Sequence, residues 1–185
     1  VFKGNHHIPY STVSEFAARN SVVFMAPSKT FNVAGLSSSV AIIPHNTHFA
    51  RFERALHVGH FGMGNIFGTV ALEAAYAHGD EWLNQMMDYL WGNYLYLEHF
   101  IKKRLPTIKV MKPEATYLIW LDFREYGLKD EELFKFVIEE AKVGLNNGGR
   151  FGQGGDGWLR INIGCPRSIL EEALERLKKA FGSLG

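Results

Sequence analysis

Apolar residues recur along the chain with two alternating spacings, one helical and one strand-like. Apolar positions three or four residues apart indicate helices, whereas short β-branched and apolar runs indicate strands. The pattern predicts helices over 12–19, 46–57, 64–78, 80–105, 129–142 and from Ser168 onward, and strands over 21–26, 38–43, 107–111, 115–123 and 157–164. Because strands alternate with helices, we expect an α/β fold with a boundary inside the long helix near residue 90.

Polar residues at the helix starts and apolar runs in the strands sharpen this picture. Thr12 with Glu15, and Ser168 with Glu171, have the spacing of a capping box, in which a hydroxyl and a carboxylate satisfy free N–H groups of the first turn. The run over 21–26 is apolar on both faces, which predicts a buried strand.

Charge and cysteine content exclude several function classes. The chain has 185 residues, with 20 Lys and Arg against 19 Asp and Glu, so no net basic field would attract nucleic acid or an anionic membrane. The basic C-terminal helix does not change this, because its Lys and Arg follow Glu residues at helical spacing. The single cysteine, Cys165, excludes an intramolecular disulfide and suits a reducing compartment. No apolar run is long enough to span a bilayer, and no signal peptide is visible.

One lysine lies where the predicted strand over 21–26 gives way to a polar turn. Lys29 follows Pro27 and Ser28, and small residues surround it at Ala26, Ala34 and Gly35. An amine at such a junction is a candidate Schiff-base nucleophile, the hydroxyl of Ser28 could bind a phosphate, and the small residues would let a flat ring approach the backbone. The alternative is an exposed loop lysine, which is the common case.

The motif around this lysine, APSKTFNVAGL, resembles the cofactor-lysine motif of fold-type I pyridoxal-phosphate-dependent enzymes. It is most similar to the class I/II aminotransferase family, in the branch of the cystathionine β-lyases and C–S lyases. The segments NIFGTVALEAAY, PEATYLIWLDF and GLNNGGRFGQGGDGWLRINIGCPRSILEEALERL follow in the order of that branch's C-terminal half. The resemblance implies the C-terminal part of a large domain over 1–90, with a mixed, mostly parallel sheet, and a small α+β domain over 91–185, joined by the long helix.

The resemblance also implies roles for three residues. Lys29 would hold pyridoxal 5'-phosphate covalently and then move the proton on the substrate Cα, with the cofactor as electron sink. Ser28 would hydrogen-bond the cofactor phosphate. Arg160, in WLRINIG, would bind the substrate α-carboxylate with its planar fork. The alternative for Arg160 is a strand arginine paired with a surface acid.

Two positions depart from the pattern of many aminotransferases, and other groups are missing. Ala26 stands where a second hydroxyl is common, and Ser37 stands where a basic residue often meets the phosphate. These departures favour the C–S lyase branch slightly. The aspartate that pairs with the pyridine nitrogen, the Gly-rich phosphate loop and the ring-stacking aromatic would all precede Val1. We therefore expect a C-terminal fragment, inactive or nearly so by itself.

The resemblance implies a cytoplasmic homodimer that acts on amino acids. The expected reaction is β-elimination of a sulfur leaving group, as in the conversion of cystathionine to homocysteine, pyruvate and ammonia. The first alternative is transamination to a 2-oxo acid, since both reactions begin with loss of the Cα proton. The second alternative is a non-catalytic interaction or regulatory module, because the ring-binding groups are missing.

Three further patterns are weaker. Gly152, Gly154 and Gly157 match G-x-G-x-x-G, but this run precedes a predicted strand, whereas the dinucleotide motif follows one. It is then a flexible loop or, by family likeness, a loop that closes over substrate near Arg150. The pairs His45/His48 and His57/His60 could share a metal, but no carboxylate or cysteine completes a ligand set, and we predict no metal site. The segment 60–68 predicts a tight turn, which by likeness approaches a partner subunit's cofactor.

Overall fold

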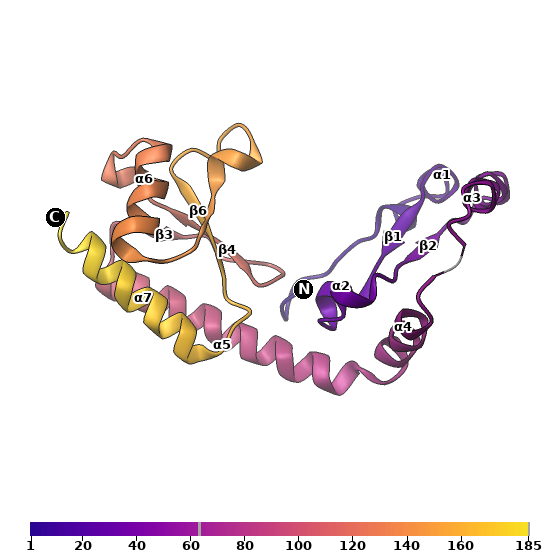
Figure 1. The fold of residues 1–185 in the computed structure, drawn as a ribbon, viewed down its shortest axis with the longest axis horizontal. Coiled ribbons are helices and arrows are strands. Elements are labelled where there is room, and N and C mark those ends of the chain that lie inside the picture. The colour runs from indigo at the N-terminus through magenta and orange to yellow at the C-terminus, as the bar shows by residue number, and fades with distance from the viewer. Residues whose placement is uncertain (63, 185) are drawn as a thin grey trace. The chain divides into compact units, whose positions relative to one another are not determined.

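The computed structural model describes residues 1–62 and 64–184 and divides into two compact units (Figure 1). The N-terminal unit comprises His6–Met86, and the C-terminal unit comprises Met87–Gly185 together with Val1–Asn5. The division falls inside the long helix α5 (Asp80–Arg104). Which domains of a larger protein these units correspond to stays a prediction.

The N-terminal unit contains a two-stranded sheet and four helices before α5. Its elements are η1 (Tyr10–Thr12), α1 (Glu15–Arg19), β1 (Val23–Met25), α2 (Pro27–Thr30), η2 (Ala34–Leu36), β2 (Val40–Ile42), α3 (Asn46–Val58) and α4 (Ile66–His78). β1 and β2 pair antiparallel, with Val23 opposite Ile42. The expected sheet is mixed, and these two strands form an antiparallel pair within it. α2 is a single turn, too short to carry the chain back along β1, so the chain returns in the opposite direction.

The strand predicted over 21–26 exists but is not buried on both faces. Phe24 is 65% exposed and Met25 is 45% exposed. An apolar run indicates only that both faces of a strand can be covered by other parts of a protein. In the described residues β1 belongs to a small sheet with a single partner strand, β2. The expectation of a buried strand was thus wrong for this chain, although the strand itself is confirmed.

Both predicted capping boxes were wrong in detail. α1 begins at Glu15, because the Ser14 hydroxyl accepts a hydrogen bond from the Ala17 N–H at 3.0 Å. The Thr12 hydroxyl instead donates to the Pro9 carbonyl at 2.8 Å. The last helix, α7 (Arg167–Phe181), follows Pro166, whose φ of −53° already suits a helix start. A serine two positions later caps α1 in place of the threonine, and a proline precedes α7 in place of a hydroxyl cap.

The C-terminal unit is built on a four-stranded antiparallel sheet. Its elements after α5 are β3 (Lys109–Val110), β4 (Leu118–Asp122), η3 (Arg124–Tyr126), α6 (Asp130–Phe136), a π turn (Val137–Ala141), β5 (Asn146–Asn147), η5 (Gly148–Phe151), β6 (Trp158–Asn162) and α7. The strand order is β3-β4-β6-β5. The α-helix within the predicted range 129–142 thus ends at Phe136 and widens into a π turn, and the two-residue strand β5 was not predicted.

One face of this sheet packs against α5, α6 and α7. Ile119 and Leu121 of β4, and Leu159 and Ile161 of β6, lie in a core with side chains from these three helices. Side chains alternate along a strand, so the intervening positions emerge on the outer face. That outer face carries Trp120, Trp158 and Arg160, all half-buried.

A buried asparagine joins α5 to the connection between β6 and α7. The Asn93 amide donates to the carbonyls of Ile163 at 2.9 Å and Cys165 at 3.0 Å, and its oxygen accepts from Arg167 Nε at 2.8 Å. Asn93 is fully buried, so each of these polar groups needs its partner. This node fixes where β6 ends and holds its last residues against α5.

The α/β fold class is confirmed, with helices and two sheets in the described residues. Across residues 1–62 and 64–184, no helix combines the length and hydropathy needed to cross a membrane.

Candidate active site

Lys29 lies on a single turn of helix directly after the first strand. β1 ends at Met25, Ala26 is extended, and Pro27 occupies the first helical position, where its missing N–H costs nothing. Ser28 and Lys29 follow within α2, with Ser28 half-buried and Lys29 exposed. The structure therefore places the two predicted cofactor residues side by side at the end of a strand.

Backbone and aromatic contacts anchor α2. The Phe31 N–H donates to the Pro27 carbonyl at 2.8 Å, and the Val33 N–H donates to the Ser28 carbonyl at 3.1 Å. The Phe31 ring lies 5.7 Å from the Tyr76 ring of α4 and 6.0 Å from the ring of Trp82. Aromatic pairs at these separations add to the packing. The backbone that carries Lys29 is thus tied to α4 and to the start of α5.

The first turn of α4 holds the loop that follows Lys29. The Asn65 side chain donates to the Leu36 carbonyl at 3.2 Å and caps α4 by accepting from the Phe67 N–H at 3.0 Å. A Cβ on Gly68 would come within 2.5 Å of the same Leu36 carbonyl, so only glycine allows this approach. Ser37, where a basic residue was expected in many relatives, adopts a left-handed φ of 51°.

The residues around Lys29 fit a flat aldehyde cofactor that carries a phosphate. Among residues 1–62 and 64–184, no ion pair or hydrogen bond to a protein group involves the Lys29 amine. A Cβ built on exposed Gly35 would meet nothing within 4 Å, so the backbone there is open to a ring. The Ser28 hydroxyl beside the amine is a suitable phosphate donor. An amine, a hydroxyl and open backbone are thus grouped in one short segment.

Arg160 lies on β6 in the C-terminal unit, at the centre of the outer face of the sheet. Its strand partners are Trp120 on one side and Asn146 on the other. The guanidinium carbon lies 4.4 Å from the ring centre of Phe151 and 5.9 Å from that of Trp120. Its NH2 group donates to Asn146 Oδ1 at 3.1 Å. Stacking and one hydrogen bond therefore hold the group, with no carboxylate.

The alternative of a surface ion pair has no support at Arg160. Within the part of the chain that the structure describes, no ion pair includes this residue. Its Nε is buried and finds no hydrogen-bond partner there. A buried donor left unsatisfied costs roughly 1–3 kcal/mol. In the described residues no carboxylate balances the charge of Arg160, which makes its terminal N–H groups suitable for binding an anion.

Backbone geometry explains the glycine run between η5 and β6. Gly152, Gly154 and Gly157 have φ values of 111°, 89° and 75°, which side-chain-bearing residues rarely adopt. The Asp130 carboxylate accepts from the Gly157 N–H at 3.1 Å and from the Asn147 amide at 2.7 Å, so one acid ties both ends of this loop. These glycines serve a tight loop that enters a strand, and no nucleotide site is needed to explain them.

The histidine pairs do not form a metal centre in the described residues. The rings of His45 and His48 lie 5.0 Å apart on α3. Across residues 1–62 and 64–184, no group of three or more His, Cys, Asp or Glu side chains could hold a metal. In the predicted turn over 60–68, Met63 lies outside the described residues, and His60 has a left-handed φ of 55°.

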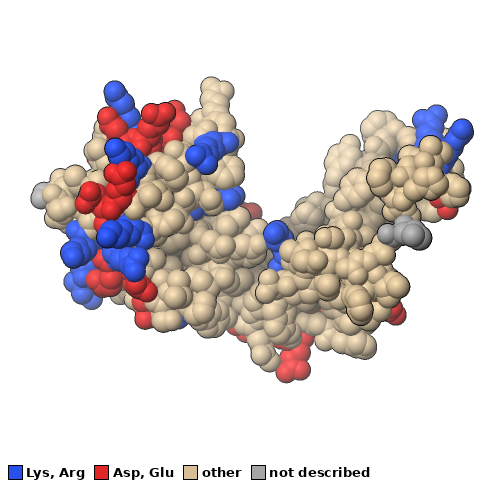
Figure 2. Space-filling model, viewed as in Figure 1, with Lys and Arg blue, Asp and Glu red and all other residues tan. Residues whose placement is uncertain are grey.

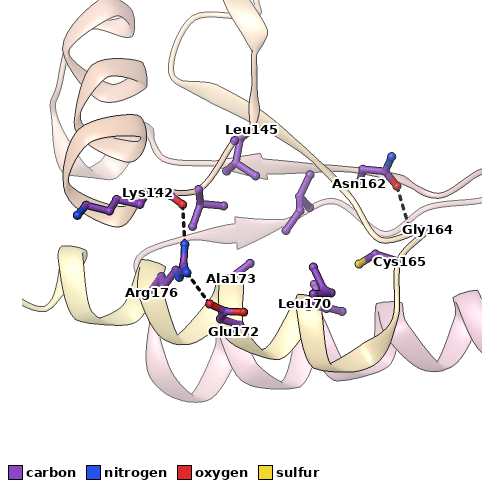
Figure 3. A pocket seen from close by; sticks show the side chains of 13 residues that line it. Lys142, Leu145, Asn162, Gly164, Cys165, Leu170, Glu172, Ala173 and Arg176 are labelled. Atoms are coloured by element: carbon purple, nitrogen blue, oxygen red, sulfur yellow. Dashed lines mark hydrogen bonds and ion pairs between the residues drawn. The ribbon is translucent and has the colours of Figure 1, made fainter.

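A cavity of about 380 Å³ lies elsewhere in the C-terminal unit, between the end of the π turn, β6 and α7 (Figure 3). Its floor is apolar, with Leu145 and Leu170 among its lining residues. At its rim Arg176 donates to the Lys142 carbonyl at 3.1 Å and pairs with Glu172. Burial raises the pKa of the Cys165 thiol in its wall, so this thiol stays protonated and is a poor nucleophile.

Sequence reasoning singled out Lys29 and Arg160, whose roles stay predictions, but it missed the residues around Arg160. Asn146, Phe151 and Trp120 come from three other segments, and only strand register and loop closure bring them to Arg160. The signal that could have found them is the alternation of Trp158 and Arg160 on one face of β6. That alternation predicts that both side chains lie on the outer face, but it does not predict which residues of other segments contact Arg160.

Comparison with known proteins agrees with these features. No protein-family model matches the chain. The cystathionine β-lyase PatB of Bacillus subtilis (strain 168) is 43% identical over 178 residues, which are 96% of this chain and 46% of the relative. The protein MalY of Escherichia coli (strain K12) is 34% identical over 177 residues, 95% of this chain and 44% of the relative.

Solved structures show the same relationship. Cystalysin of Treponema denticola, which contains pyridoxal 5'-phosphate, superposes with a TM-score of 0.95 at 32% identity, covering 100% of this chain and 47% of cystalysin. The pyridoxal-phosphate-bound C–S lyase of Staphylococcus hominis superposes with a TM-score of 0.83 at 35% identity, covering 97% of this chain and 46% of the lyase.

The chain thus spans about half the length of the curated relatives it matches. It belongs to the fold-type I pyridoxal-phosphate-dependent proteins of the class I/II aminotransferase family, in the branch that contains the cystathionine β-lyases and C–S lyases.

Proposed function

We propose that this chain supplies the cofactor lysine and the carboxylate-binding arginine of a pyridoxal-phosphate-dependent C–S β-lyase. The observation that carries the proposal is the unpaired amine of Lys29 beside Ser28, in a chain 43% identical to a cystathionine β-lyase. The reaction takes cystathionine and water to homocysteine, pyruvate and ammonia. Breakage of the Cβ–S bond follows loss of the Cα proton.

Each predicted residue has a defined task in this proposal. Lys29 would hold the cofactor through its amine, and the same amine would accept the Cα proton of the substrate. Ser28 donates to the phosphate, and Arg160 binds the α-carboxylate in a bidentate manner. When bound, pyridoxal phosphate supplies the electron sink that makes the Cα proton acidic.

Transamination is the second candidate reaction. The aspartate aminotransferase of Pyrococcus horikoshii is 25% identical over 98% of this chain, so a transaminase is among its relatives. Lys29 would serve as proton carrier in both reactions. At full natural length, pyruvate release from cystathionine without a 2-oxo acid supports the lyase, whereas amino transfer to a 2-oxo acid supports the transaminase.

We also propose a homodimer in the cytoplasm. Large exposed apolar side chains in the N-terminal unit, such as Phe61, Ile66 and Phe67, support association with another protein surface. Light scattering of the protein at full natural length tests the dimer.

The direct test is an absorbance scan during titration with pyridoxal phosphate, on the 185-residue chain and on the protein at full natural length. Borohydride reduction and peptide mass mapping then locate the attached cofactor. A visible band with the label on Lys29, lost in Lys29→Ala, supports the proposal. Scattered labelling of surface lysines at full natural length would reject it and favour a non-catalytic interaction module. Such a module would keep its partner in a pull-down with Lys29→Ala.

A further inference from the structure

The outer face of the C-terminal sheet arranges three side chains around the guanidinium of Arg160. Asn146, Arg160 and Trp120 are directly opposite one another on β5, β6 and β4, so they form one row across the strands. Side chains directly opposite on neighbouring strands are within contact distance. Phe151, from η5, stacks on the guanidinium 4.4 Å from its carbon. The row and the stacked ring together limit how the Arg160 side chain can turn.

Asn146 makes the one hydrogen bond to this guanidinium that occurs within residues 1–62 and 64–184. It accepts from NH2, at one edge of the planar fork. The Nε group on the same fork has no partner there, and no carboxylate pairs with Arg160. The fork is therefore held at one point, and its terminal N–H groups other than the one bound to Asn146 are left for a ligand.

The strand that carries Asn146 is short but firmly held. β5 is two residues long. The next residue, Asn147, is 8% exposed, donates to the Asp130 carboxylate at 2.7 Å and accepts from the Gly149 N–H at 2.7 Å. These bonds fix the backbone at Asn147 and with it the position of Asn146. The Asn146 side chain is itself exposed and contributes little to the core.

We propose that Asn146 is a positioning residue that orients the Arg160 guanidinium for an incoming α-carboxylate. This inference rests on the proposed carboxylate-binding role of Arg160. Asn146 accepts one hydrogen bond from NH2 of Arg160, and the Phe151 ring lies against the guanidinium. Together they set the orientation of the guanidinium plane in which the carboxylate binds. A bidentate arginine–carboxylate pair depends on that plane, because two parallel bonds form only when both groups are coplanar. Asn146 itself touches neither the substrate nor the cofactor.

The test compares a substrate with its carboxamide in the holoenzyme at full natural length. In Asn146→Ala we expect KM for the amino-acid substrate to rise about five- to tenfold, with kcat within about twofold of the starting value. The carboxamide lacks the group that the fork recognises, so its kcat/KM should change less than about twofold. A general structural defect would lower both substrates equally.

Two further variants make the test specific. Asn162→Ala removes an amide from the same face of β6, two residues from Arg160, and should leave the preference for carboxylate over carboxamide unchanged. Asn146→Asp places a carboxylate against the guanidinium, where it competes with the substrate, so KM should rise more than about tenfold. If Asn146→Ala does not fold, Asn146→Ser carries the same expectation, because its shorter side chain cannot reach NH2.

A measurement without cofactor or turnover checks the same geometry. The Arg160 Nε–H signal, assigned by its loss in Arg160→Lys, is followed by NMR while acetate is added to the 185-residue chain. We expect acetate to shift this signal with a dissociation constant about five- to tenfold weaker in Asn146→Ala than in Asn162→Ala.

The outcomes separate this inference from the proposed function. If Arg160→Lys keeps the full preference for carboxylate over carboxamide, Arg160 does not bind the carboxylate, and the proposed role and this inference both fail. If Arg160→Lys loses the preference while Asn146→Ala matches Asn162→Ala, the role of Arg160 stands and only the positioning by Asn146 is overturned.

Discussion

The two units of the chain differ most in what they bury. In the C-terminal unit, α5, α6, α7 and the sheet enclose one continuous core that includes Leu97, Leu121 and Leu174. In the described residues of the N-terminal unit, the buried positions are Ala17, Pro27 and Gly68, whereas Phe61, Ile66 and Phe67 are each more than three-quarters exposed. Arg160 thus lies on a unit with its own core, and Lys29 lies on a unit without one.

Charge follows the same division in the face shown in Figure 2. Lys, Arg, Asp and Glu are interspersed over much of the C-terminal unit, while most of the N-terminal unit is uncharged in that view. An uncharged surface with many large apolar side chains is typical of a surface that another protein segment covers. Lys29 and Arg160, the two residues proposed for chemistry, therefore lie on units that differ in how they are stabilised.

The largest expected effect is a loss of catalytic activity, and it comes from changing Lys29 in the N-terminal unit. Lys29→Ala removes the amine that would attach the cofactor and carry the Cα proton. We expect β-elimination at full natural length to fall at least about 1,000-fold, without loss of folded protein. Pyruvate release and thermal unfolding measure the two quantities, and Thr30→Ala is the matched control on the same turn. An active Lys29→Ala variant would contradict the assignment.

The next effect tests the difference in burial. Leu174 is fully buried, and Leu174→Ala should lower the free energy of unfolding of the C-terminal unit by about 2–5 kcal/mol, because the cavity cannot fully collapse. Phe24 is 65% exposed, so Phe24→Ala should change the stability of the 185-residue chain by less than about 0.5 kcal/mol. Urea titration followed by circular dichroism measures both. Equal losses would show that the N-terminal unit has a core after all.

A smaller effect concerns alkaline pH and the core of the C-terminal unit. Burial, and then the hydrogen bond to Glu98 at 2.9 Å, raise the pKa of Tyr94 to about 12. Because the folded pKa lies above the unfolded value of about 10, this contribution is complete below pH 10 and is lost as the pH rises toward 12. We expect a loss of up to about 3 kcal/mol over that window, from about 1.4 kcal/mol for each of about two pKa units.

Tyr94→Phe isolates this contribution. The variant has no ionisable phenol at this position, so its stability should change less between pH 10 and pH 12 than that of the starting protein. Unfolding midpoints at several pH values within the window measure the difference. Parallel pH profiles in the two proteins would disprove the assigned cause.

The smallest effect is expected at acid pH on the outer face of the C-terminal sheet. The Arg124 guanidinium donates to Asp122 at 2.9 and 2.8 Å and holds the pKa of that carboxyl below its usual value. The folded pKa is lowered, so the stabilisation is present above the unfolded pKa of about 4 and is lost as the pH falls through the lower folded value. Arg124 is largely exposed, and solvent screens the pair.

Asp122→Asn should therefore flatten the dependence of stability on pH below about pH 4, by less than the loss in Leu174→Ala. Raising the salt concentration should shrink the difference between the two proteins, since exposed charges are screened. A variant with the same acid profile as the starting protein would show that the pair adds nothing measurable.

Much of the architecture was predictable from local patterns. The helical spacing through α5 and its end before Pro106, the strands β1, β2, β4 and β6, and the α/β class all follow from the apolar pattern. Helix starts were not predictable to the residue, because Thr12 and Ser14 are alternative caps two residues apart and only the folded backbone selects one. The two-residue strand β5 was invisible, because its pairing with β6 defines it and two asparagines have no strand preference.

The sequence by itself determined the kind of chemistry available, through the amine of Lys29, the hydroxyl of Ser28 and the guanidinium of Arg160. These side chains carry their chemistry wherever they lie, and a motif of consecutive residues keeps Ser28 beside Lys29. Only the tertiary structure decided that Asn146, Trp120 and Phe151 surround Arg160, that Phe31 anchors the turn of Lys29, and that one unit has a core while the other does not. Those facts depend on register, loop closure and burial, which arise between segments far apart in the chain.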